Sequence, residues 1–162
     1  MSHLSLRTLI EDVAKSLSDK VQFGYGRRSE FNAITNKRYP YIWLLPLTAS
    51  RRYPGVDGTK TKLWSVALVF LDLDKADSNE KQTAKIHDEL DVMVDRFLES
   101  LDTWYMRSED VIGSFEITND NQQPFFKDDT DINSGWLLTF QVELSDDFDY
   151  CRPEYVNLYG DI

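Results

Sequence analysis

Residues 62–73 read KLWSVALVFLDL and contain the longest apolar run of the 162-residue chain. The apolar side chains fall on both alternations of a strand, with Trp64, Val66, Leu68 and Phe70 on one and Leu63, Ala67, Val69 and Leu71 on the other. A strand with apolar residues on both sides is typical of the middle of a sheet. The run therefore predicts a central strand that is covered on both faces for most of its length.

Two stretches have the spacing of amphipathic helices. The first, residues 4–19, carries an apolar stripe of Leu6, Leu9, Ile10, Val13 and Leu17. The second, residues 78–101, carries a longer stripe of Ile86, Leu90, Met93, Val94, Phe97, Leu98 and Leu101. Asp77 followed by Glu80 resembles a capping box at its start.

The remaining segments predict further strands and loops. Residues 39–47, YPYIWLLPL, predict a short strand with Pro40 and Pro46 at its ends or on an edge, because proline lacks the N–H of a ladder hydrogen bond. Residues 111–118 alternate weakly, and residues 136–144 alternate as a half-buried strand does. A short hairpin is expected around Phe125 and Phe126.

Two segments have no clear periodicity. Residues 21–35 predict an irregular strand followed by a basic connection, and residues 48–58 have the glycine and proline content of a protruding loop. Together the pattern predicts an α+β fold, with a mixed or antiparallel sheet of about four to six strands packed against the two main helices. We expect one domain over residues 1–145 and an extended C-terminal arm over residues 146–162.

Composition favours a folded protein, since 41% of the residues are hydrophobic despite a net charge of −10. We expect neither an export signal nor a membrane anchor, because the first residues lack a basic start and the longest apolar run is too short. The single cysteine, Cys151, fits a reducing cytoplasm. In the acidic arm, Phe148, Tyr150, Tyr155 and Tyr159 are candidate anchors for docking on a neighbour or on the same domain.

The charge is distributed unevenly. From Lys20 to Lys62 the chain has nine basic residues against Glu30 and Asp57, whereas the rest has 9 basic and 26 acidic residues. A chain of this kind suits head-to-tail association of identical copies, because a basic surface of one copy can face an acidic surface of the next. The alternative is that both sets of charges are solvated surface.

Candidate catalytic motifs are weak. The fragment from Gly24 to Ser29 lacks the third glycine of a dinucleotide fingerprint. Asp72, Asp74 and Asp77 offer oxygen ligands, but a strand end followed by a helix cap explains them better. Neither His3 nor His87 is placed for nucleophilic catalysis, since His87 lies away from the centre of the apolar stripe. We expect no enzyme activity, no cofactor and no metal.

The order of elements, together with YPYIWLLP, LWSVALVFLDLD and GWLLTFQVELSDDFDYC, resembles phage tail-terminator or tail-completion proteins of the lambda type. The resemblance implies a virion protein, assembled in the host cytoplasm, that forms a homo-oligomeric ring of six or twelve copies at the neck or tail. Its partners would be copies of itself and the neighbouring connector and tail proteins, with DNA only as passing cargo and no membrane.

The resemblance also implies roles for two sets of residues. The basic side of the subunit contact would be formed by Arg27, Arg28, Arg51, Arg52, Lys60 and Lys62. The acidic side, or the lining of a lumen, would be formed by Asp128, Asp129, Asp131, Asp146, Asp147 and Asp149. Two other classes stay open: another head–tail connector or tail-tube subunit, and an acidic adaptor or inhibitor that binds a host partner.

Overall fold

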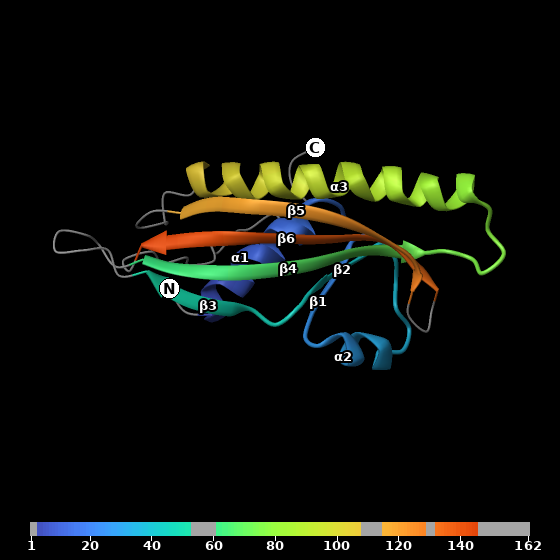
Figure 1. The fold of residues 1–162 in the computed structure, drawn as a ribbon, viewed down its shortest axis with the longest axis horizontal. Helices are drawn as coiled ribbons and strands as arrows, with labels where there is room; N and C mark the ends of the chain where they lie inside the picture. Colours follow the sequence, from blue (N-terminus) through green and yellow to red (C-terminus); the bar gives the residue numbers. More distant parts are fainter. Residues whose placement is uncertain (1–2, 53–60, 108–114, 129–131, 146–162) are drawn as a thin grey trace.

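A computed structural model describes residues 3–52, 61–107, 115–128 and 132–145 of the chain. In chain order the elements are α1 (His3–Ser16), β1 (Gln22–Tyr25), α2 (Arg28–Ala33), β2 (Tyr41–Leu44), β3 (Thr48–Arg52), β4 (Thr61–Leu73), α3 (Glu80–Arg107), β5 (Phe115–Asp128) and β6 (Asn133–Ser145). Figure 1 shows the long helix α3 running beside one extended sheet, with α2 on the opposite side. None of the described helices combines the length and the low charge needed to cross a bilayer.

The six strands form a single mixed sheet in the order β1-β2-β4-β6-β5, and β3 also pairs with β4. All neighbours are antiparallel except β1 and β2, which are parallel. The predicted α+β class with two main helices is confirmed. β4 is central, because β2 and β3 pair end to end along one of its sides and β6 pairs along the whole of the other.

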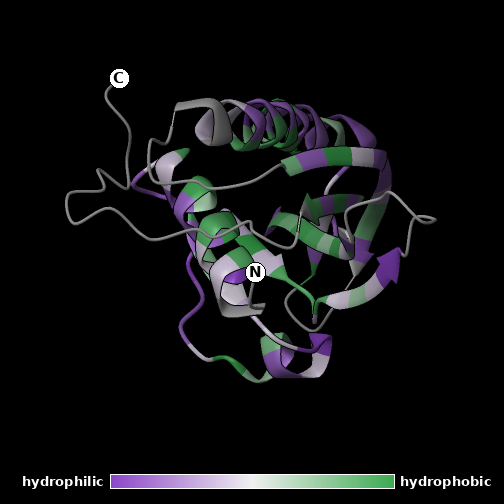
Figure 2. Ribbon diagram, turned by 90° about the vertical axis from the view of Figure 1, so that its left-hand side faces the viewer, coloured by the Kyte–Doolittle hydropathy of each residue, from purple (hydrophilic) through white to green (hydrophobic). Residues whose placement is uncertain are grey.

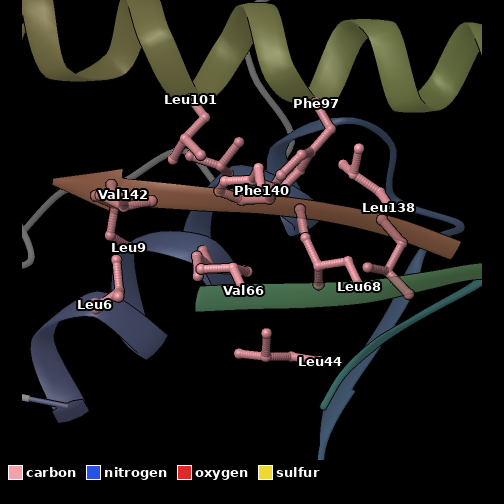
Figure 3. Packing of buried hydrophobic residues seen from close by; sticks show 14 of the residues in the cluster. Leu6, Leu9, Leu44, Val66, Leu68, Phe97, Leu101, Leu138, Phe140 and Val142 are labelled. Atoms are coloured by element: carbon pink, nitrogen blue, oxygen red, sulfur yellow. The ribbon is translucent and has the colours of Figure 1, made fainter. Parts of the chain in front are cut away.

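The main core lies between one face of the sheet and the helices α1 and α3. Figure 3 shows Leu6 and Leu9 of α1 and Phe97 and Leu101 of α3 on either side of the side chains from β6, such as Phe140. All five are fully buried or nearly so. Figure 2 shows hydrophobic and hydrophilic residues mixed along α1 and α3, as their amphipathic sequences require. Burial of these faces holds the helices on the sheet.

A second, smaller core covers the opposite face of the sheet at one end. Phe31 of α2 meets the rings of Tyr41 and Trp43 edge to face, at centroid distances of 5.2 and 5.3 Å. Val69 and Leu71 of β4 complete this cluster. At the other end of the same face, Ser65 is exposed and Leu63 and Ala67 are partly buried. The expectation that β4 is covered on both faces is therefore right for only one half of the strand.

Three local predictions were wrong. The segment read as irregular between residues 21 and 35 contains the helix α2, which exists because Phe31 is buried against the sheet. The first five residues of the expected loop 48–58 form the edge strand β3. In place of a strand ending at 118 and a separate hairpin, β5 runs from Phe115 to Asp128, with an irregularity between Thr118 and Asn121 that breaks its alternation.

The start of α3 also differs from the prediction. The reciprocal capping contacts join Asn79 and Gln82, each side-chain oxygen accepting the other residue's backbone N–H at 3.0 Å. Asp77 is exposed and Glu80 is the first helical residue. The capping box therefore begins two residues after Asp77. It is formed by the side-chain amides of Asn79 and Gln82 and not by the predicted acidic residues.

Asp74 joins three parts of the fold. It lies after β4, is 6% exposed, and accepts hydrogen bonds from the hydroxyls of Ser78, Thr83 and Ser134 and from the Lys75 N–H, at 2.6 to 2.8 Å. Burial alone would raise the pKa of Asp74, but these four hydrogen bonds outweigh burial and hold its pKa well below the ordinary value. The carboxylate therefore fixes the loop after β4, the first turn of α3 and the start of β6.

Replacing Asp74 by Asn is expected to lower the free energy of unfolding by about 3 kcal/mol at pH 7, because hydrogen bonds to a buried charge are lost. Since the folded-state pKa is depressed, this contribution is complete above the ordinary aspartate pKa of about 3.9 and is lost as the pH falls below it. Urea unfolding at pH 7 and pH 3 checks both points. Asp77→Asn, an exposed change in the same loop, is the control, and an equal effect of both variants would contradict the assignment.

Gly135 of β6 is required by close approach of two strands. A Cβ atom at this position would overlap the carbonyl oxygen of Phe70 in β4. Gly135→Ala is therefore expected to destabilise the fold by about 1–3 kcal/mol through overpacking, measured by urea denaturation. Ser65→Ala, at an exposed position of β4, should change stability by less than about 0.5 kcal/mol. Equal stability of the two variants would show that the strands separate without cost.

Candidate assembly interface

Among the described residues, the sheet has two exposed edges at the same end. At that end four strands lie side by side in the order β3-β4-β6-β5. One row of cross-strand partners runs from Arg51 through Lys62 and Leu144 to Phe115. The row ends on β3 at one edge and on β5 at the other, and within the described residues no further strand pairs with either.

The β3 edge is short and basic. All five of its residues, TASRR, are exposed, and it ends with Arg51 and Arg52. The guanidinium of Arg52 lies 3.5 Å from a carboxylate oxygen of Glu143 on β6, across β4. This contact is largely exposed and contributes little. The edge therefore presents cationic side chains and the outward-facing N–H and C=O groups of a strand.

The β5 edge is acidic at the same level along the strands as the basic β3 edge. Glu116 and Asp120 are exposed on it, and Glu116 pairs directly with Glu143 of β6. Two carboxylates opposite each other in a sheet repel, and Arg52 approaches only the Glu143 side of the pair. A further cation placed beside Glu116 would relieve that repulsion.

The directions of the two edge strands are compatible with pairing between copies. β3 is antiparallel to β4, β4 to β6 and β6 to β5, so β3 and β5 of one copy run in opposite directions. A second copy in the same orientation would place its β3 antiparallel to β5 of the first. Since β1 of that second copy lies outside β2, level with Gln122–Phe125, β5 of the first copy would have to bend away from the sheet of the second at that level. Arg52 and Glu116 lie on the same face of the sheet, because their rows, through Thr61 and through Glu143, are two residues apart.

The predicted basic residues form two groups, not one. Arg51, Arg52 and Lys62 lie at the β3 end, whereas Arg27 and Arg28 lie at the start of α2, where Arg28 lines a small hollow with Val69 and Leu71. Val69 lies eight positions after Thr61 in β4, which corresponds to about 27 Å along a strand. Lys62 is half-buried, with its ammonium 4.5 Å from the Trp64 ring, so it is less available than the arginines.

Most of the predicted acidic residues and arm anchors lie outside the described part of the chain. Asp128 ends β5. The residues outside the description are Lys60, Asp129, Asp131, Asp146, Asp147, Asp149, Phe148, Tyr150, Tyr155 and Tyr159. Their proposed roles, and the division into a domain and an arm at residue 145, stay predictions. The acidic groups that the structure places at the edge, Glu116 and Asp120, were not singled out from the sequence.

His87 lies in a different environment from the one predicted. It is 8% exposed on the buried face of α3, and its ring contacts those of Phe126 and Trp136 at 4.7 and 5.4 Å. Its helical spacing from Thr83 and Leu90, both buried, is the sequence signal for this position. The prediction placed His87 off the stripe because only apolar residues were used to define the stripe, and a histidine does not count among them.

No family model matches the chain, and no curated protein matches it significantly.

Proposed function

We propose that this protein is a structural subunit that assembles head to tail with copies of itself, with β3 of one copy beside β5 of the next. The observation that supports this most is the presence of a basic and an acidic strand edge at matched heights of one sheet. Strand addition supplies main-chain hydrogen bonds, and opposite charges select the pairing. Such a contact uses two different surfaces, so repeated copies form a ring or a filament.

The resemblance in element order makes a ring at the neck or tail of a phage the specific form of this proposal. In that role the subunit would act as a tail terminator or tail-completion protein between the connector and the tail. Its acidic charge would keep passing DNA from binding, since like charges repel the phosphates. The acidic long helix supports this reading, with seven acidic and four basic residues in α3.

A second function is supported by the same arginines. Charged residues on a short edge strand also prevent unwanted pairing between copies. In that case the protein would be monomeric and would bind a different protein, as an adaptor or inhibitor does. Native mass spectrometry of the purified chain separates the two, because the ring subunit gives a defined oligomer without any partner.

Arg51→Glu with Arg52→Glu is expected to weaken the association by about tenfold per contact, because attraction to Glu116 and Asp120 becomes repulsion; each exposed pair contributes up to about 1 kcal/mol. The loss should be largest at low salt, where screening is weakest. Sedimentation velocity at two salt concentrations measures it.

Two further variants make this test specific. Adding Glu116→Lys and Asp120→Lys to the double arginine variant reverses both edges and is expected to restore the oligomer. Lys81→Glu with Arg96→Glu, an equal change of charge at two exposed positions of α3, should leave it intact. An oligomer that survives the double arginine reversal unchanged would refute the charge pairing.

A further inference from the structure

A pocket of 580 Å³ lies where the first turns of α3 meet the paired ends of β5 and β6. Its aromatic wall is formed by His87 of α3, Phe126 of β5 and Trp136 of β6. The rings of Phe126 and Trp136 lie 4.7 and 5.4 Å from that of His87, and yet Phe126 is 64% exposed. A large apolar side chain exposed beside a hollow of this size is typical of a binding surface. The pocket therefore has apolar surface that the described residues leave uncovered.

Hydrogen bonds hold the walls of this pocket together. The Trp136 indole N–H donates to the carbonyl oxygen of His87 at 2.9 Å, and the His87 Nε2 atom lies 2.9 Å from the carbonyl oxygen of Phe125. The ammonium of Lys127 donates to the carbonyl oxygen of Ser78, also at 2.9 Å. These contacts join α3 to both strands around the pocket. The pocket is therefore formed in advance of binding, and an incoming side chain need not rearrange it.

The lining of the pocket suits a tyrosine side chain. Its inner surface is mainly apolar, whereas Glu80 and Asp88 lie at exposed positions of the lining. Tyrosine combines an apolar ring with a polar hydroxyl, so the ring can pack on the aromatic wall while the hydroxyl donates to a carboxylate. Because Lys127 also lines the pocket, a charged side chain of either sign would meet a like charge.

Residues 146–162 are long enough to reach the pocket. They follow Ser145, the last residue of β6, and Trp136 lies nine positions before Ser145, which corresponds to about 30 Å along the strand. An extended chain spans at most about 3.3–3.6 Å per residue. Tyr159 is fourteen residues after Ser145 and can therefore lie up to about 46 Å from it, whereas Phe148 reaches only about 10 Å.

The internal segments outside the described residues fit the pocket less well. Residues 53–60 lead into β4 at Thr61 and residues 108–114 lead into β5 at Phe115, and both positions are level with the last two residues of β6, far from the pocket. Each segment has eight residues or fewer and is joined to described elements at both ends, so it extends at most about 15 Å from them. Residues 129–131, between β5 and β6, have the sequence DTD and no aromatic ring.

We propose that the ring of Tyr159 occupies this pocket in the same chain, with residues 146–158 forming the connection from the end of β6. Tyr155 could reach the pocket only by a straight path, since ten residues span about 33 Å, whereas Tyr159 has length to spare for the reversal of direction after β6. The surrounding residues 155–160, YVNLYG, carry no charge, so the acidic helix α3 does not repel them. This docking lies within one chain and does not depend on the proposed assembly.

Disulfide trapping tests the docking in the full chain. Cys151→Ser removes the native thiol, and Ala84→Cys with Gly160→Cys then places one thiol at an exposed lining position and one beside the proposed anchor. Mild oxidation is expected to give an intramolecular disulfide, detected by mass spectrometry as a monomer without free thiols. Adding Tyr159→Ala should lower its rate of formation at least about fivefold, since truncating a side chain that fills a pocket weakens the docking.

Two comparisons separate the proposed docking from its alternatives. Phe148→Cys in place of Gly160→Cys is the matched control and should form little intramolecular disulfide, because it lies too close to Ser145 to reach the pocket. A disulfide that links two chains, at a rate that rises with protein concentration, would assign the pocket to a second copy and overturn the inference. An equal rate with and without Tyr159→Ala would also overturn it, because the tether alone would then bring the thiols together.

A synthetic peptide of residues 153–162 tests the pocket without introduced thiols. It is titrated into the full chain carrying Tyr159→Ala, and the indole N–H resonance of Trp136, identified with Trp136→Phe, is followed by NMR. We expect the peptide to shift this resonance toward its position in the unchanged chain, and Phe126→Ala in the protein to weaken binding at least about fivefold. The control is the same peptide with Tyr159→Ala. If it binds as well as the unaltered peptide, or if neither peptide shifts the Trp136 resonance, the inference fails.

Discussion

The buried carboxylate of Asp74 is the interaction on which the architecture of one end of the molecule depends. Four donors converge on it, from the loop after β4, from the first turn of α3 and from the start of β6. Long helices and strands pack through many weak contacts that tolerate sliding, whereas a charge in a dry site tolerates no loss of its partners. Asp74 thereby sets where α3 begins relative to the β5–β6 hairpin, and hence where His87, Phe126 and Trp136 meet.

The helices cover the two faces of the sheet to different extents. One face is buried along its length by α1 and α3, while α2 closes the other face near Trp43 and Leu71 alone. The remaining half of that face is polar, with a shallow hollow of 370 Å³ among Ser65, Thr139 and Gln141. The strand edges that flank this polar half are those that carry Arg52 and Glu116. The half of the sheet that is covered on both faces therefore contributes most to stability, and the other half carries the charged strand edges.

Sequence periodicity predicted those elements whose burial is regular. The stripe of α3, the double alternation of β4 and the single alternation of β6 all follow from one repeated packing environment. α2 was missed because one side chain, Phe31, anchors it, and a single residue has no period. β3 was missed because exposed edge strands need no apolar residues, and β5 because its irregularity changes which face successive residues occupy.

The candidate sites were harder to predict, because their residues are brought together by strand register and not by sequence. Glu116 and Arg52 face a common surface through three intervening pairings, and the pocket joins residues near positions 78, 126 and 136. The uneven distribution of charge was predicted from the sequence, but the separation of the basic residues into two groups was not.

The opposed directions of β3 and β5 have a consequence for any object built by joining them. Copies related in this way all point the same way, so the two rims of the object differ. One displays the loop before α3, the end of β5 and the start of β6, and the other displays the end of β3 and the start of β4. A closed circle of such copies has polarity, and it can distinguish what lies above it from what lies below without any additional component.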